Sequence, residues 1–94
     1  MLTITLVRKR LRSGEYCEKC NDVHHQLEKS GYISHLTRIV DADEANPVSE
    51  GMLLAIEHNV TQAPFFIVEK EDGATEVYTS YLKLVRDVLQ QIDQ

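Results

Sequence analysis

The stretch "GEYCEKCNDVHHQLEKSG", Gly14–Gly31, contains both cysteines of the chain, Cys17 and Cys20. Positions typical of one buried helix face follow the first cysteine at helical spacing: Cys20, Val23, His24 and Leu27. Gly31 stands where a helix of about three turns ends, because glycine readily adopts the left-handed conformation of a C-terminal cap. The stretch therefore predicts a helix that begins at a Cys-x-x-Cys pair.

Alternating elements are predicted on both sides of this helix. Leu2–Val7 alternates apolar and Thr residues, which favours a strand, and the basic residues that follow read as a loop: Arg8, Lys9, Arg10 and Arg12. A second strand is expected around Leu36–Val40. Asn46-Pro47 has the residues of a helix start, and the buried face of that helix is expected at Val48, Met52, Ala55 and Ile56.

The last third of the sequence predicts a hairpin and a helix. Phe65–Glu69 is expected to pair with Thr75–Tyr78 across a turn that contains Asp72-Gly73. Thr79 or Ser80 is expected to cap a helix with an apolar stripe at Leu82, Val85, Val88, Leu89 and Ile92. The order is then βαβαββα, an α/β fold in which one domain, residues 1–94, carries a mixed four-stranded sheet with helices on both faces.

Composition narrows the possible functions. The 94 residues carry a net charge of −5, which argues against nucleic acid as a partner. No apolar run approaches the ~20 residues of a membrane span, and the N-terminus does not read as a secretory signal, so we expect a cytoplasmic protein that does not bind membranes. Two cysteines do not make a disulfide framework in such a chain. The basic run is interpreted either as a solvated loop or as charge that acts on the thiols or on an acidic partner.

Three pieces of the sequence, "CEKC", "IVDADEANP" and "HNVTQAPFFIVEKEDGATEV", together resemble the thioredoxin superfamily in its short glutaredoxin-like form. The resemblance covers nearly the whole chain and implies a thioredoxin-like fold. It also implies a thiol-disulfide oxidoreductase that acts on disulfides of proteins or small thiols, with no cofactor beyond the cysteine pair. "VYTSYLK" stands where glutaredoxins have a Gly-Gly and an acidic pair, so we expect glutathione to be a poor donor.

Helix geometry suggests a role for each cysteine. Only a thiolate attacks a disulfide, and the unpaired N–H groups at a helix N-terminus stabilise negative charge there. Cys17 is therefore expected to attack and Cys20, one turn further in, to resolve the mixed disulfide. Lys19 is expected to modulate the thiolates.

The resemblance further implies a substrate groove beside the thiols. By the family pattern, the Ala63-Pro64 bond is expected to be cis and to expose the Ala63 backbone to an extended substrate. Tyr16 is expected to form a wall of that groove.

Two other interpretations stay open at this point. Cys17, Cys20 and His24 share one helix face and are candidate zinc ligands, although zinc needs a fourth ligand from elsewhere. Alternatively, the chain is a binding or adaptor module that kept the fold without the catalysis.

Overall fold

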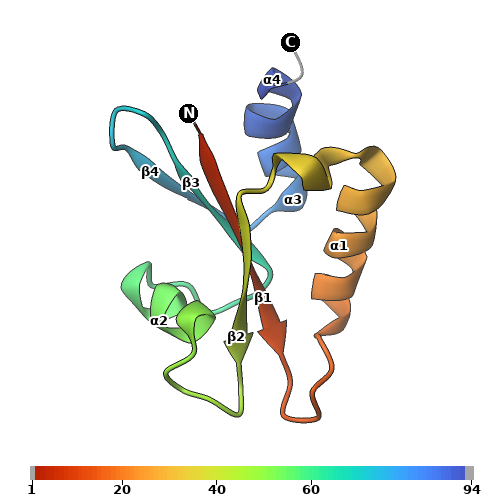
Figure 1. Cartoon of the computed structure of the whole chain (residues 1–94), viewed down its shortest axis with the longest axis vertical. Coiled ribbons are helices and arrows are strands. Elements are labelled where there is room, and N and C mark those ends of the chain that lie inside the picture. The colour runs from red at the N-terminus through yellow and green to blue at the C-terminus, as the bar shows by residue number, and fades with distance from the viewer. Residues whose placement is uncertain (1, 93–94) are drawn as a thin grey trace.

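The computed structural model of the chain describes residues 2–92, which form one mixed four-stranded sheet with helices on both faces (Figure 1). Its elements are β1 (Thr3–Arg10), α1 (Glu18–Ser30), the 3₁₀ turn η1 (Tyr32–His35), β2 (Arg38–Asp43), α2 (Glu50–Glu57), β3 (Phe65–Glu69), β4 (Thr75–Tyr78) and α3 (Tyr81–Leu84), followed by the π turn η2 (Val85–Leu89) and α4 (Gln90–Ile92). The predicted fold class is confirmed.

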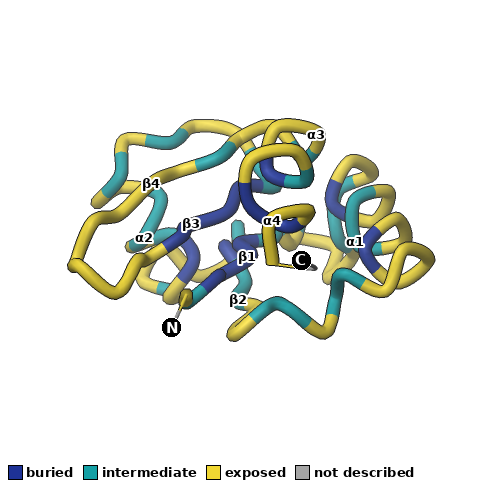
Figure 2. The backbone as a smooth tube through the Cα atoms, turned by 90° about the horizontal axis from the view of Figure 1, so that it is seen from above, coloured by how far each residue is buried: buried dark blue, intermediate teal, exposed yellow. Residues whose placement is uncertain are grey.

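The strands lie in the order β2-β1-β3-β4, with β1 and β2 parallel and the other pairs antiparallel. The predicted hairpin is confirmed, with Phe66 opposite Tyr78 and Glu69 opposite Thr75. Of the two central strands, β3 is buried along most of its length and β1 along half of it (Figure 2). In Figure 1 the carboxyl ends of β1 and β2 point the same way, toward the loop that leads into α1. The cysteines therefore lie at this edge of the sheet.

A hydrophobic core covers each face of the sheet. Side chains alternate between the faces along β1, so Ile4 and Leu6 pack toward α1 and the C-terminal helix, while Val7 packs toward α2. Leu27, Phe66 and Leu84 belong to the first cluster. The second is smaller and contains Val7, Ala42, Phe65 and Ile67. Within residues 2–92, no helix is long and apolar enough to cross a membrane.

Arg8, Lys9 and Arg10 do not lie in a loop, as the sequence had suggested, because β1 extends through Arg10, whereas Arg12 lies in the turn that follows. In the parallel register Arg8 lies beside Asp41 and Arg10 beside Asp43. Basic residues on one strand thus meet acidic residues on its neighbour, and opposite charges on adjacent strands favour the pairing.

The second strand and second helix both begin later than predicted. After Gly31, with φ +83°, the chain forms η1 before β2 starts at Arg38. Thr37 anchors that start through its N–H and hydroxyl, which bond to the Ile4 carbonyl and N–H at 2.8 and 3.0 Å. Asn46-Pro47 lies in a turn in which the Asn46 side chain accepts a hydrogen bond from the Val48 N–H.

Helix α2 therefore starts at Glu50, and its buried face differs from the prediction. The Ser49 hydroxyl accepts a hydrogen bond from the Asp43 N–H at 3.0 Å and ties this start to the end of β2. Met52 and Ala55 contact the second core cluster as predicted, but Val48 and Ile56 are exposed. The late start accounts for Val48, which precedes the helix.

The C-terminal helix also differs from the prediction in its buried positions. Ser80, rather than Thr79, caps it by accepting a hydrogen bond from the Lys83 N–H. Leu82 is 78% exposed and Ile92 36% exposed. Val85, Val88 and Leu89 pack on the core as predicted, whereas Tyr81 and Leu84 pack there in place of Leu82 and Ile92. The position of the sheet decides which residues at the two ends of this helix are covered.

Candidate active site

A tight turn brings the Cys-x-x-Cys segment back onto the end of β1. Gly14, with φ +93°, donates its N–H to the Leu11 carbonyl, and the Leu11 N–H donates to the backbone carbonyl of Glu15 at 2.7 Å. Tyr16 then lies in an antiparallel bridge with Arg10. A left-handed residue suits glycine here because it lacks a Cβ. The turn thus delivers Cys17 directly beside β1.

The backbone of Lys9 holds both cysteines. The Cys17 N–H donates to the Lys9 carbonyl at 3.1 Å, and the Lys9 N–H donates to Cys20 Sγ at 3.2 Å. These groups are available because pairing between β1 and β3 ends at Val7 and Phe65, two residues earlier. The Cys-x-x-Cys segment therefore bonds to the end of β1, beyond the last residue of β1 that pairs with β3.

The two sulfurs occupy different environments although they are 2.6 Å apart. Cys17 is the cap residue of α1 and is partly exposed, whereas Cys20 is 1% exposed. Burial, the hydrogen bond with Cys17 and the charge of Cys17 raise the pKa of Cys20 to about 12, against the opposing effects of the Lys9 N–H and the Arg8 charge. Cys20 is therefore a neutral thiol near neutral pH, and a disulfide between the two sulfurs requires only a small movement.

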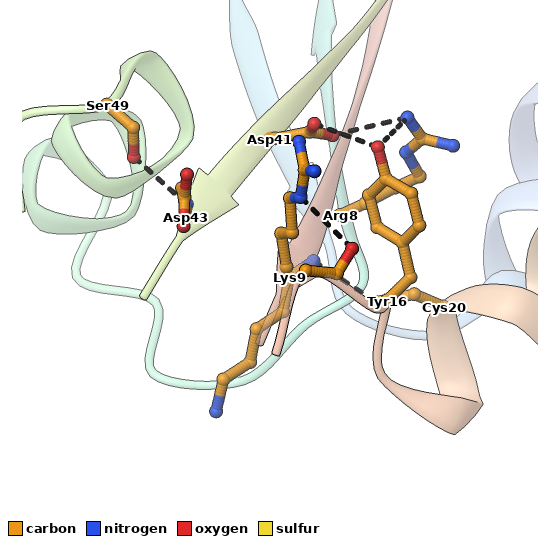
Figure 3. A network of polar contacts seen from close by, with 9 residues as sticks. Arg8, Lys9, Tyr16, Cys20, Asp41, Asp43 and Ser49 are labelled. Carbon is orange, nitrogen blue, oxygen red and sulfur yellow. Dashed lines mark hydrogen bonds and ion pairs between the residues drawn. The ribbon is translucent and has the colours of Figure 1, made fainter. Parts of the chain in front are cut away.

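Beside the motif, Arg8, Tyr16 and Asp41 form a polar cluster, shown in Figure 3 near the start of α1. Arg8 Nη2 donates to the Tyr16 hydroxyl at 2.9 Å and to Asp41 Oδ1 at 3.2 Å, while the Tyr16 hydroxyl donates to Asp41 Oδ2 at 2.9 Å. Arg8 Cζ also lies 4.1 Å from the centre of the Tyr16 ring, a cation-π contact. Burial and the bond to Asp41 raise the pKa of Tyr16.

The other basic residues of the run are also engaged. Lys9 Nζ lies 3.5 Å from Glu44 Oε2, and Arg10 Nε donates to the Gly14 carbonyl at 3.1 Å. The Arg12 N–H donates to Glu44 Oε1. Ion pairs with β2 and the following turn thus offset the charges of Arg8 and Lys9.

The remaining predicted site residues lie in three places. Lys19 is exposed in the first turn of α1, one position from Cys20. The Ala63-Pro64 bond is cis, as expected, and both residues are half-buried just before β3. Ala63 also lines a hollow of about 560 Å³ that extends from Lys9 along α2 to Met52 and Ile56. The ring of Tyr16 is held by Arg8 and Asp41.

His24, one of the two histidines of α1, contacts a side chain of the same helix. His24 Nε2 lies 3.4 Å from Glu28 Oε1, and His24 Nδ1 is buried without a hydrogen-bond partner in the described part of the chain. Across residues 2–92, no three His, Cys, Asp or Glu side chains are gathered in a way that could hold a metal ion. The arrangement gives no support to the zinc interpretation.

Sequence reasoning missed the roles of Arg8 and Asp41 in this site. The sequence predicts a loop at Arg8 and a second strand that ends before Asp41. A usable signal was present, because "RKR" at 8–10 and "DAD" at 41–43 end two strands that are predicted to be parallel neighbours. Without the register, no pairing of individual charges follows.

Comparisons with known proteins support the fold. No protein-family profile matches the chain, and no curated protein matches its sequence. Among solved structures, the chain is similar to thioredoxin f2 of Chlamydomonas reinhardtii, with a TM-score of 0.52 and 19% identity over 95% of this chain and 79% of that one. The chain thus has a thioredoxin-like fold, with a Cys-x-x-Cys pair at the start of its first helix.

Proposed function

We propose that this protein is a thiol-disulfide oxidoreductase in which Cys17 attacks a disulfide and Cys20 resolves the resulting mixed disulfide. The observation that carries the proposal is the different exposure of two adjacent sulfurs at one helix N-terminus. Cys17 is accessible, and Cys20 is buried 2.6 Å from it. An accessible thiol that attacks and an inner thiol that completes the exchange are what the reaction needs.

The substrate class proposed is a disulfide in a protein or a small thiol compound, bound in a glutaredoxin-like manner beside Tyr16, Ala63 and Pro64. Lys19 in the first turn of α1 would modulate the thiolates, with Glu15 and Glu18 acting in the opposite direction. Since "TSYLK" replaces the residues that hold glutathione in glutaredoxins, we propose another thiol donor. A reducing compartment such as the cytoplasm would keep the pair available for exchange.

Single cysteine variants test this assignment. Serine is far too weak an acid to attack sulfur near neutral pH, so Cys17→Ser should lose disulfide exchange entirely. Cys20→Ser should still attack and then remain as a mixed disulfide. We expect mass spectrometry, after brief exposure to a neutral disulfide such as dithiodipyridine, to show one stable adduct on Cys17 of Cys20→Ser and none on Cys17→Ser.

The alternatives give different results in the same experiment. Equal reactivity of the two variants would contradict the role assignment. An adaptor module would form adducts no faster than an unfolded cysteine peptide. Zinc in the native protein, lost in both variants, would point to a metal site and refute the proposal.

A further inference from the structure

Arg8 is a charged residue that directly follows the buried segment of β1, residues 4–7. Ile4 and Leu6 precede it at two-residue intervals and pack on the side of the sheet that α1 covers. Because side chains alternate along a strand, Arg8 continues that face and lies toward the helix that carries Cys20. Its side chain is only 20% exposed.

The strand connects Arg8 to the inner cysteine. The next residue, Lys9, donates its N–H to Cys20 Sγ, and the Arg8 charge acts on Cys20 in the direction that favours a thiolate. The other charged or polar groups that act on this sulfur are Cys17 on the same helix and the Lys9 N–H. Arg8 is therefore the cation that opposes the effect of burial on Cys20.

Asp41 and Tyr16 fix this cation in place and limit its charge. Both side chains bond to Arg8 Nη2, and the Tyr16 ring stacks against the guanidinium. Arg8 Nε is buried and has no hydrogen-bond partner among the described residues. A partly buried ion pair adds little to stability compared with apolar packing. The Arg8–Asp41 pair therefore matters chiefly through its electrostatic effect on nearby groups.

We propose that the Arg8–Asp41 pair sets the rate at which Cys20 resolves the mixed disulfide. Arg8 stabilises the negative charge that develops on Cys20 Sγ, Asp41 reduces that effect, and Tyr16 positions the pair. Arg8 is a positioning residue that acts on the field around the thiol, and the inference rests on the proposed function.

The affected step is the second of two exchanges. In the first, the Cys17 thiolate attacks one sulfur of a disulfide, whose S–S bond breaks as one thiolate leaves with the electron pair. In the second, Cys20 loses its proton to solvent and its thiolate attacks Cys17 Sγ. The Cys17–Cys20 disulfide forms and the other thiolate leaves, so the dithiol is oxidised by the two electrons that reduce the substrate.

Stopped-flow mixing of reduced protein with dithiodipyridine separates the two steps. This neutral probe releases one absorbing thiopyridone per exchange, in a phase that depends on reactant concentration and then in one that does not. Arg8→Gln should slow the second phase at least about threefold, the net effect when a tenfold smaller thiolate fraction is partly offset by a more basic nucleophile. Asp41→Asn, which frees the Arg8 charge, should speed it by a similar factor.

The decisive result is that Arg8→Gln slows the second phase whereas Asp41→Asn speeds it. Both variants break the same ion pair, so a purely structural role would change both rates in the same direction. Arg8→Lys, which keeps the charge, should retain most of the wild-type rate if Arg8→Gln proves unstable. Shifts in the same direction, unchanged rates, or an Arg8→Lys rate as slow as that of Arg8→Gln would overturn the inference. A wild-type protein without the first phase would overturn the proposed function itself.

Discussion

At the scale of single residues, position in the fold distinguishes two chemically identical side chains. Cys17 and Cys20 are three residues apart, yet one lies at the accessible start of α1 and the other beneath the first turn. Desolvation disfavours a thiolate, and the Lys9 N–H and the Arg8 charge offset it only in part. The fold therefore holds Cys20 protonated until an exchange reaction uses it.

This protonation predicts a loss of stability in alkaline solution. The pKa of Cys20 is raised from 9.0 to about 12, so its stabilising effect is complete below pH 9 and is lost as pH rises toward 12. Between these values the unfolded chain releases a proton that the folded chain keeps. We expect the unfolding free energy of the reduced protein to fall by about 1 kcal/mol per pH unit more than that of Cys20→Ala.

Denaturant unfolding under reductant at a series of pH values measures this difference. Cys20→Ala is a suitable control because it keeps Tyr16 and Tyr78, whose pKa values are also raised. Parallel curves for the two proteins would show that Cys20 releases its proton at the same pH in the folded and the unfolded chain and would contradict the prediction.

At the scale of elements, the contact of α2 with β2 depends on one small residue. Gly51 lies in the first turn of α2, and a Cβ added there would meet the Ala42 backbone nitrogen at 2.3 Å and the Asp41 carbonyl oxygen at 2.5 Å. Backbone atoms in a paired strand have little freedom to move. The helix would have to move away from the strand that carries Asp41.

Gly51→Ala should therefore lower the unfolding free energy by about 1–3 kcal/mol, although alanine is the better helix former. Leu53→Ala, on the exposed side of the same helix at 51% exposure, is the matched control and should change it by less than about 0.5 kcal/mol. Urea unfolding followed by circular dichroism compares the two. A neutral or stabilising Gly51→Ala would mean that α2 packs farther from β2.

At the scale of the whole molecule, one sheet is shared by two cores of unequal size. The adjacent residues Phe65 and Phe66 point to opposite faces, each about 1% exposed, and so belong to different clusters. Tyr32, Tyr78 and Tyr81 pack only against the cluster of Phe66. Since β1 and β3 contribute to both clusters, neither face can lose its packing without disturbing the other.

We therefore predict a single cooperative unfolding transition, as for one domain. Phe65→Ala and Phe66→Ala should each lower its free energy by about 3–5 kcal/mol. The chain has four tyrosines and no tryptophan, so tyrosine fluorescence reports mainly on the Phe66 face. In Phe65→Ala this signal should shift together with far-ultraviolet circular dichroism, whereas an unshifted tyrosine transition would indicate two independent units.

The sequence by itself determined the order of elements, the two strands of the hairpin and the Cys-x-x-Cys helix with its end at Gly31. These features depend on local chemistry: alternation in a strand, a glycine at a positive φ, and a turn at Asp72-Gly73. The predicted start of α2 was wrong, and so were Leu82 and Ile92 in the buried stripe of the C-terminal helix. In both cases neighbouring choices had similar local quality, and the sheet selected between them.

Only the tertiary structure decided how the charges at the site are arranged. The parallel register of β1 and β2 sets Arg8 beside Asp41, and the turn at Gly14 returns Tyr16 to the same place. Contacts between residues 25 and 33 positions apart depend on how whole strands align, which no local pattern specifies. The burial that makes Cys20 differ from Cys17 arises in the same way, from the docking of α1 onto the end of β1.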